Sequence, residues 1–314
     1  MKSHYSQVLL VSLCFALLAG SGVYGFGVDY YVAYHKANID WGGYLDRLGW
    51  ALSTMTIYGL HIGVYLVSFL LSLSVGLFLS KTTETFCRKH SWFFLLLHLI
   101  FIHTWPIIMS TSNAMRQGIC MSFLFLALYF LLSRERFYFL VSIILVITSH
   151  KSGILFATLL FISNFYLGWI RAFNCSLFCK KYISMILGVL LSIFVYFSLS
   201  ILFDNFEESR IIKGDYRFLF LLINIVYIFI YKLYLFVRFD QLDAFLFVCS
   251  FVMPVFLLFG FNWEYERLNM IILIPYMVSF SRIFVNRDKR YVLLISSLLL
   301  LLMTFLSGMY AALK

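Results

Sequence analysis

The chain has 314 residues, of which 63% are hydrophobic, 20% are aromatic and only 12% are charged. A soluble domain of this size keeps much of its surface in water, so this composition excludes a soluble protein and favours one surrounded by lipid. The net charge of +10 does not predict a nucleic-acid partner, because the excess of basic residues follows the expected membrane orientation, as argued below.

Long apolar runs predict membrane-spanning helices, because lipid offers an exposed backbone no hydrogen-bond partner. We predict an all-α, polytopic helix bundle, with one transmembrane domain over residues 1–314 and about eleven spans. The first run resembles a signal peptide, but it continues to Phe26, so we predict an uncleaved helix. The runs lie near residues 6–26, 57–80, 91–111, 117–133, 137–149, 152–170, 182–203, 218–237, 244–262, 268–281 and 291–312.

The distribution of Lys and Arg predicts the orientation of these spans, because basic residues collect on the cytoplasmic side. With a cytoplasmic N-terminus, the cytoplasmic segments hold 15 basic and five acidic residues, and the outer segments hold nine of each. The whole charge excess then lies on one side. Eleven spans place the C-terminus in the periplasm, with periplasmic loops at about residues 27–56 and 204–217.

Nine basic residues on the outer side go against this rule, and five of them are arginines. Arginine binds phosphate through a planar fork of donors, so the group predicts an anionic ligand such as a lipid pyrophosphate. The alternative is that each arginine pairs with a neighbouring acid, as Asp46 beside Arg47 and Glu266 beside Arg267 would allow. The five are Arg47, Arg116, Arg210, Arg217 and Arg267.

Two candidate residues lie where apolar helices are predicted to begin or end. Arg116 precedes the run from Gln117 to Leu132, where a bound anion would use both the guanidinium and the free N–H groups of the helix start. His150 lies with Lys151 and Ser152 in a polar break between two runs, which makes it the best candidate for a general base. The alternative is a hydrogen-bonded histidine at the membrane interface.

Carboxylates and aromatic rings on the outer side are typical of a sugar-binding surface. The loop at 27–56 contains Asp29, Tyr30 and Tyr34, although an interfacial aromatic belt would use the same rings. Glu266 offers a carboxylate close to a cationic site, or it simply suits a helix N-terminus. No outward cluster of carboxylates is present, so we expect no metal and no other cofactor.

Four segments, in this order, resemble the EpsG family of bacterial membrane proteins, which is close in role to Wzy-type O-antigen and exopolysaccharide polymerases. The likeness covers most of the chain. The first loop departs from the family pattern, since Trp41-Gly42-Gly43-Tyr44 replaces an acidic element. The segments are Gly27-Val28-Asp29-Tyr30, Asn113-Ala114-Met115-Arg116-Gln117-Gly118-Ile119, His150-Lys151-Ser152-Gly153 and Glu266-Arg267-Leu268.

The resemblance implies a multi-pass enzyme of the bacterial inner membrane that acts at its periplasmic face. Its reaction would be glycosyl transfer between oligosaccharide repeat units carried on undecaprenyl pyrophosphate, with a chain-length co-polymerase as a possible partner. The expected catalytic residues are His150 as base, Asp29 or Glu266 as its alternate, and Arg116 on the pyrophosphate. The expected substrate-binding residues are Arg267, Arg210, Arg217, Lys151, Arg47, Tyr30 and Tyr34.

Three alternative functions are open at this point. A flippase or transporter of lipid-linked oligosaccharide usually has internal repeats and ionisable groups near the membrane midplane. In this sequence the charges lie at helix ends and no repeat is visible, which favours the polymerase. Another outer-face sugar or acyl transferase, or a non-enzymatic assembly scaffold, is less well separated by sequence.

Overall fold

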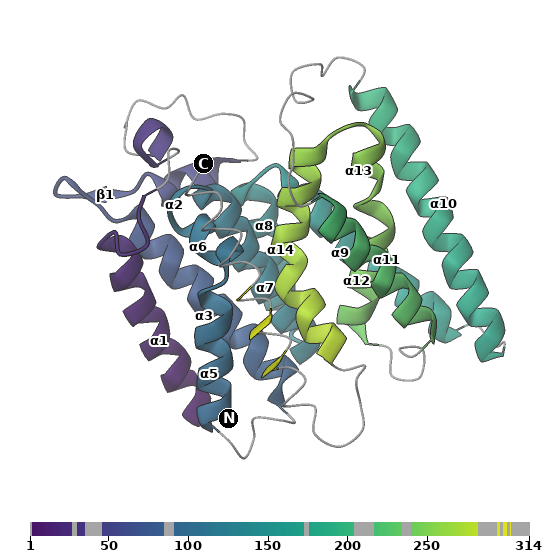
Figure 1. Cartoon of the computed structure of the whole chain (residues 1–314), viewed down its shortest axis with the longest axis horizontal. Helices are drawn as coiled ribbons and strands as arrows, with labels where there is room; N and C mark the ends of the chain where they lie inside the picture. Colours follow the sequence, from purple (N-terminus) through teal and green to yellow (C-terminus); the bar gives the residue numbers. More distant parts are fainter. Residues whose placement is uncertain are drawn as a thin grey trace. The chain divides into compact units, whose positions relative to one another are not determined.

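The computed structural model describes residues 2–26, 30–34, 46–84, 91–172, 176–203, 217–233 and 240–281, with residues 294–295, 298–299 and 302. Helices dominate this part of the chain (Figure 1). Five of them are long and apolar enough to cross a membrane, and a bent pair would make a sixth. The chain is therefore an α-helical membrane protein, while the eleven spans and the orientation of the termini stay predictions.

Ten of the eleven predicted apolar runs coincide with helices in the described part of the chain, and most of the run at 291–312 lies outside it. Three boundaries differ from the helix ends by six residues. The first helix, α1 (Lys2–Gly20), ends before Phe26 in a turn. The second span, α3 (Gly63–Thr82), begins six residues late because residues 56–61 form a hairpin. The last described helix, α14 (Asn262–Ser281), begins before its apolar run.

The chain divides into two compact units, one of residues 1–157 with 286–314 and one of residues 158–285. The first unit contains α1, η1 (Tyr30–Tyr34), α2 (Arg47–Ser53), β1 (Thr56–Ile57), β2 (Leu60–His61), α3, α5 (Ser91–Ile102), α6 (Trp105–Ser112), α7 (Met115–Ser133), α8 (Arg136–Ser149) and the start of α9 (Ser152–Ala172). The rest of α9 belongs to the second unit with α10 (Leu177–Phe203), α11 (Arg217–Leu233), α12 (Gln241–Val252), α13 (Val255–Leu258) and α14.

In the first unit, α3 is the central helix and contacts α1, α2, α5, α6 and α7. Its Phe78 is fully buried and stacks on Phe125 of α7, with ring centroids 5.6 Å apart. α7 also packs along α8, and the short helix α2 lies against α3, α7 and α8 (Figure 1). This packing brings α2, the start of α7 and the end of α8 together.

The helices α5 and α6 are separated by a short break and bent by 59° relative to each other. The break at His103-Thr104 precedes Pro106, which has no N–H to donate to the Ile102 carbonyl and so cannot continue the α5 ladder. The bend turns α6 onto α7. It thereby places the short polar turn at Asn113-Ala114, from which α7 begins.

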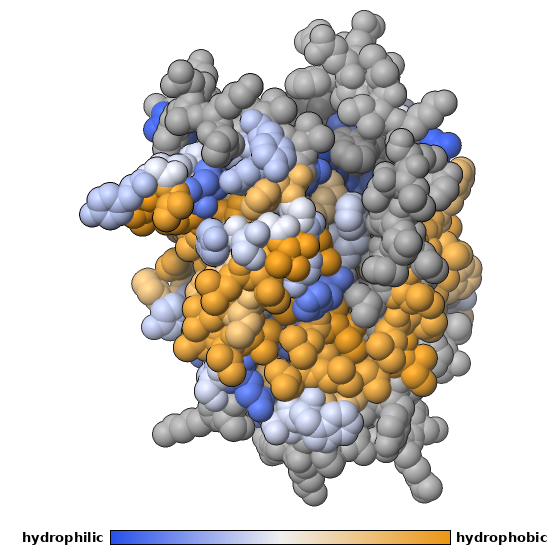
Figure 2. Space-filling view, turned by 60° about the vertical axis from the view of Figure 1, so that its left-hand side comes forward, coloured by the Kyte–Doolittle hydropathy of each residue, from blue (hydrophilic) through white to orange (hydrophobic). Residues whose placement is uncertain are grey.

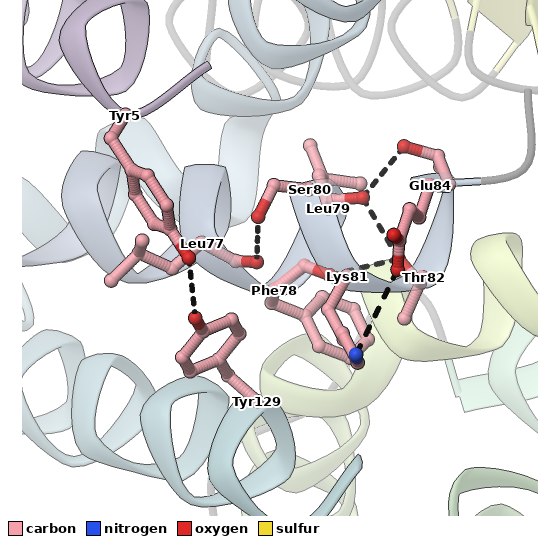
Figure 3. Close-up of polar contacts among 10 residues, drawn as sticks. Tyr5, Leu77, Phe78, Leu79, Ser80, Lys81, Thr82, Glu84 and Tyr129 are labelled. Carbon is pink, nitrogen blue, oxygen red and sulfur yellow. Dashed lines mark hydrogen bonds and ion pairs between the residues drawn. The ribbon is translucent and has the colours of Figure 1, made fainter. Parts of the chain in front are cut away.

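Figure 3 shows polar contacts near the start of α1 and the end of α3. The hydroxyls of Tyr5 and Tyr129 lie 2.9 Å apart and join α1 to α7. Lys81 pairs with Glu84 at 3.7 Å, and the Ser80 hydroxyl donates to a backbone carbonyl of its own helix. These contacts satisfy polar groups locally, which a helix end in a membrane protein requires.

The second unit is held together by a buried polar network between α11, α12 and α14. Asn224 Oδ1 accepts a hydrogen bond of 2.7 Å from the Tyr276 hydroxyl, and its Nδ2 lies 2.9 Å from both Tyr265 Oη and Asn269 Oδ1. Tyr276 also hydrogen-bonds with Ser250 at 2.8 Å. These side chains are all buried, and each has a protein partner, so the network fixes the three helices in register.

Candidate functional site

The most distinctive charged pair of the first unit joins Arg116 to Asp46. Asp46 immediately precedes α2, and Arg116 is the second residue of α7. Arg116 Nη1 lies 3.3 Å from Asp46 Oδ2. Asp46 is 5% exposed, whereas the Arg116 side chain is 27% exposed. The carboxylate is therefore the buried member of the pair, and the guanidinium lies between it and solvent.

Each member of this pair retains hydrogen-bonding capacity. Asp46 Oδ1 and Arg116 Nε are buried and have no hydrogen-bond partner among the residues that the structure describes. Asp46 does not cap α2 through its side chain either. Buried polar atoms are rarely left unsatisfied in proteins, and those that are need a specific explanation. A polar ligand that binds between the two side chains would supply the missing partners.

An aromatic wall limits the approach to Arg116. The guanidinium carbon lies 4.0 Å from the centroid of the Trp50 ring, which is a cation–π arrangement. The Tyr34 ring lies 5.6 Å from Trp50 and continues the wall. One face of the guanidinium is thus covered, and a ligand is left with the N–H donors along its edge.

His150 connects α8 to α9 through its own side chain. Its extended backbone (φ −161°, ψ 148°) ends α8. Its Nδ1 accepts the backbone N–H of Ser152 at 3.2 Å and lies 2.8 Å from the Ser152 hydroxyl. Because a backbone N–H can only donate, Nδ1 is the acceptor, and in the neutral ring Nε2 carries the proton. His150 thus acts as a helix N-cap and has a donor on its other nitrogen.

Gly49 brings the two candidate residues into one site. A Cβ added at Gly49 would clash with the carbonyl oxygen of Ser149, next to His150, and would lie 3.3 Å from Arg116 Cβ. Only glycine therefore allows α2 to approach both α8 and α7. Cys120, one turn after Arg116 on the same face of α7, hydrogen-bonds with Ser152 and lies within electrostatic range of Asp46. We refer to Asp46, Trp50, Arg116, His150 and Ser152 as the Arg116 site.

Comparison with known proteins adds a family to this geometry. The EpsG family model matches residues 7–313, which is nearly the whole chain. The chain belongs to the EpsG family. This family is associated with polysaccharide polymerase-like proteins, which supports a polymerase-type role in polysaccharide biosynthesis. No curated protein and no solved structure matches the chain.

Other predicted residues of this EpsG protein lie beside the site but play different structural parts. Lys151 is exposed in the turn between α8 and α9, and Arg47 is exposed as the first residue of α2. Tyr30 is buried, with its ring stacked on Phe26 at 4.4 Å. Burial raises the pKa of the Tyr30 phenol above its ordinary value, so the hydroxyl stays protonated at neutral pH and can donate a hydrogen bond.

The remaining predicted residues belong to the second unit or lie outside the described residues. Glu266 and Arg267 lie in the first turns of α14, and Glu266 is buried. Arg217 begins α11, with its guanidinium carbon 4.9 Å from the Phe218 ring centroid. Asp29 and Arg210 fall outside the described residues. Their proposed roles in catalysis and binding stay predictions.

Sequence reasoning missed Asp46 and Trp50 as members of the site. Asp46 was considered as a partner for its neighbour Arg47 and, with Trp50, as part of a sugar-binding first loop, whereas its carboxylate pairs with a residue 70 positions away. One signal was available, because Asp46 and Trp50 are four residues apart and therefore lie on one face of a helix. The residues that the structure describes contain no group of three or more His, Cys, Asp or Glu side chains suited to a metal ion.

Proposed function

We propose that this EpsG-family protein joins oligosaccharide repeat units carried on undecaprenyl pyrophosphate at the periplasmic face of the bacterial inner membrane. The product would be O-antigen or exopolysaccharide. The observation that carries this proposal is the Arg116–Asp46 pair, a partly exposed guanidinium beside a buried carboxylate, each with an unused hydrogen-bonding atom. The family supplies the polymer chemistry.

The reaction requires one bond to form and one to break. A hydroxyl oxygen of the acceptor repeat unit attacks the anomeric carbon of the donor sugar. The bond from that carbon to the pyrophosphate oxygen breaks, and undecaprenyl pyrophosphate leaves with the bonding electrons. The hydroxyl proton passes to a base. Catalysis therefore needs donors that stabilise the charge on the leaving group and an acceptor for the proton.

Arg116 is placed to donate hydrogen bonds to the pyrophosphate leaving group. Trp50 covers one face of its planar guanidinium, so the edge N–H groups remain for an oxyanion partner such as a phosphate, which accepts two of them side by side. The first turn of α7 adds backbone N–H groups that no side-chain cap uses, because Ala114 stands at the N-cap position. A helix start beside an arginine is a favourable place for an anion.

Asp46 is a better candidate than His150 for the group that accepts the proton. Its Oδ1 is buried and has no protein partner in the described part of the chain, whereas the Nδ1 lone pair of His150 is used by the Ser152 N–H. We therefore assign the base to Asp46 and a hydrogen-bond donor to His150, whose Nε2 carries the proton in the neutral ring. The partners of the protein would be lipid-linked oligosaccharide on undecaprenyl pyrophosphate, the bilayer and a chain-length co-polymerase.

The test is a chromosomal deletion complemented with the wild type or with Arg116→Ala. Lipopolysaccharide or capsule is separated on a gel, and lipid-linked oligosaccharide is extracted from the membrane. We expect a single repeat unit in place of the ladder, with intact variant protein in the membrane. A loss of every repeat from the cell surface would indicate a flippase. A full ladder in the deletion strain would overturn the polymerase proposal, and a full ladder with Arg116→Ala would remove Arg116 from the mechanism.

A further inference from the structure

The segment between α2 and α3 forms a two-stranded hairpin. Thr56 pairs with His61, and Ile57 pairs with Leu60. The turn residues Tyr58 (φ 49°) and Gly59 (φ 79°) both have positive φ, which is the pattern of a type I′ turn. The backbone N–H groups of Ile62 and Gly63 both donate to the Met55 carbonyl and close the base of the hairpin.

Tyr58 is an unexpected residue for this turn. Asparagine, aspartate or glycine is usual at the first position of a type I′ turn, because a bulky side chain is strained at positive φ. The Tyr58 side chain is fully exposed, and no ring contact, hydrogen bond or ion pair involves it within the described residues. The protein interior therefore gives no reason for a tyrosine here, and the reason is to be sought outside the chain.

The neighbours of Tyr58 are exposed and apolar. Leu60 is 72% exposed, and Met55 and Ile57 are also exposed. The sequence contains no Asp, Glu, Lys or Arg between residues 48 and 80. An apolar tip without charge is unfavourable in water, but it is typical of the boundary between lipid headgroups and acyl chains, where tyrosine is enriched.

The position of the hairpin in the first unit agrees with that environment. Only Ile62 separates β2 from α3, which is one of the helices able to span the membrane. The hairpin extends sideways past α1, across the direction of α1 and α3 (Figure 1). Figure 2 shows a broad hydrophobic surface, and above it at the left a projection whose tip is pale and whose base is partly hydrophobic. A bilayer around α3 would therefore meet the hairpin at its surface.

The base of the hairpin is held to the protein. His61 Nε2 lies 3.1 Å from the Tyr34 carbonyl oxygen, and the His61 ring packs at 5.1 Å against Tyr30. The tip is thus presented by an anchored base, and its depth is linked to that of α2, which precedes it directly. A contact at the tip would be transmitted to the helix that carries Trp50.

We propose that the tip of this hairpin, Ile57, Tyr58 and Leu60, is inserted into the lipid bilayer at the headgroup–acyl boundary. It holds α2 at a fixed depth in the leaflet next to the start of α3. Where the proposed function also holds, this depth places Arg116 at the level of lipid-linked pyrophosphate. The insertion itself does not depend on that function.

The test is a depth measurement with a spin label on a cysteine at position 58. Cys14, Cys87, Cys175 and Cys179 are replaced by serine, while the buried Cys120 and Cys249 are kept. The purified full-length chain is placed in vesicles of phosphatidylethanolamine and phosphatidylglycerol. Relaxation by oxygen, which collects in lipid, is compared with relaxation by a water-soluble nickel chelate. Labels at Leu10, exposed on α1, and at Glu135, exposed in the α7–α8 turn, give the lipid and water references.

The quantity compared is the ratio of oxygen relaxation to nickel relaxation. We expect this ratio at position 58 to lie between those of the Leu10 and Glu135 labels and to exceed the Glu135 ratio by about threefold or more. A ratio equal to that of Glu135 would show that the tip lies in water, and this would overturn the proposal. The matched variant is Tyr58→Asn, read through a label at position 60. Asparagine suits the turn but removes the ring, so position 60 should shift toward water. An unchanged depth would show that the ring does not anchor the tip. Neither readout needs polymerase activity.

Discussion

The Arg116 site in the first unit and the Asn224 network in the second unit are both polar clusters within a membrane protein, but they differ in completeness. In the network, Asn224, Tyr276 and Ser250 are buried and bonded to one another. In the Arg116 site, Asp46 Oδ1 and Arg116 Nε are buried and have no partner in the described residues. A complete network stabilises helix packing, whereas an incomplete one is ready for a ligand.

Arg116→Ala should have the largest effect on activity if the Arg116 site binds a ligand and the Asn224 network does not. Loss of a donor to a developing oxyanion typically lowers a rate by about 10² to 10³-fold. We expect that loss in polymer formation by membranes supplied with lipid-linked repeat units, measured per folded molecule, because the buried Asp46 carboxylate loses its partner and the unfolding midpoint falls as well. Arg116→Lys keeps the charge but not the fork, and should recover only part of the rate. Full activity in the lysine variant would show that charge alone is used.

Asp46→Asn should follow, because it keeps the shape of the side chain but removes the proton acceptor. General-base catalysis contributes typically about 10² to 10⁴-fold, so we expect a loss at the lower end of that range, since Arg116 remains. Asp46→Glu serves as the control that retains a carboxylate. If the asparagine variant made polymer at the wild-type rate, the unpartnered oxygen would have no role in the reaction.

His150 should show a smaller effect that separates capping from chemistry. Asparagine is a good N-cap residue, whereas alanine is not. If Nε2 only helps to bind substrate, His150→Asn should keep the fold and lose about tenfold in rate, since one hydrogen bond is worth about 1.5 kcal/mol. His150→Ala should also lower the unfolding midpoint. If the asparagine variant were as active as the wild type, His150 would have only the role of a helix cap and none in substrate binding.

The smallest effect on activity is expected from Tyr276→Phe in the second unit. This change removes the 2.7 Å hydrogen bond to Asn224 Oδ1. Interhelical hydrogen bonds in membrane proteins contribute about 0.6 to 2 kcal/mol, so stability should fall by about 1 kcal/mol. Activity per folded molecule should stay normal, measured after correction for the amount of folded protein. A large loss of activity at unchanged stability would contradict the division between the two clusters.

Much of the fold could be predicted from the sequence. The apolar runs coincide with helices because hydropathy over a length of about 20 residues is a local property. The Thr56–His61 hairpin was missed because Ile57 and Leu60 lead, without a charged residue, into the apolar helix that follows. The turn at Tyr58-Gly59 is the local signal that separates the two. Arg116 and His150 could be singled out because polar residues between apolar runs stand out in any membrane sequence.

Neighbours in the chain are enough to predict that helices form and which polar residues lie at their ends, because hydropathy is local. Which of those residues meet depends on how the helices pack. Arg116 pairs with Asp46, 70 positions away, because the missing side chain of Gly49 lets α2 approach α7 and α8. Such a contact depends on the packing of whole helices, and no local pattern encodes it.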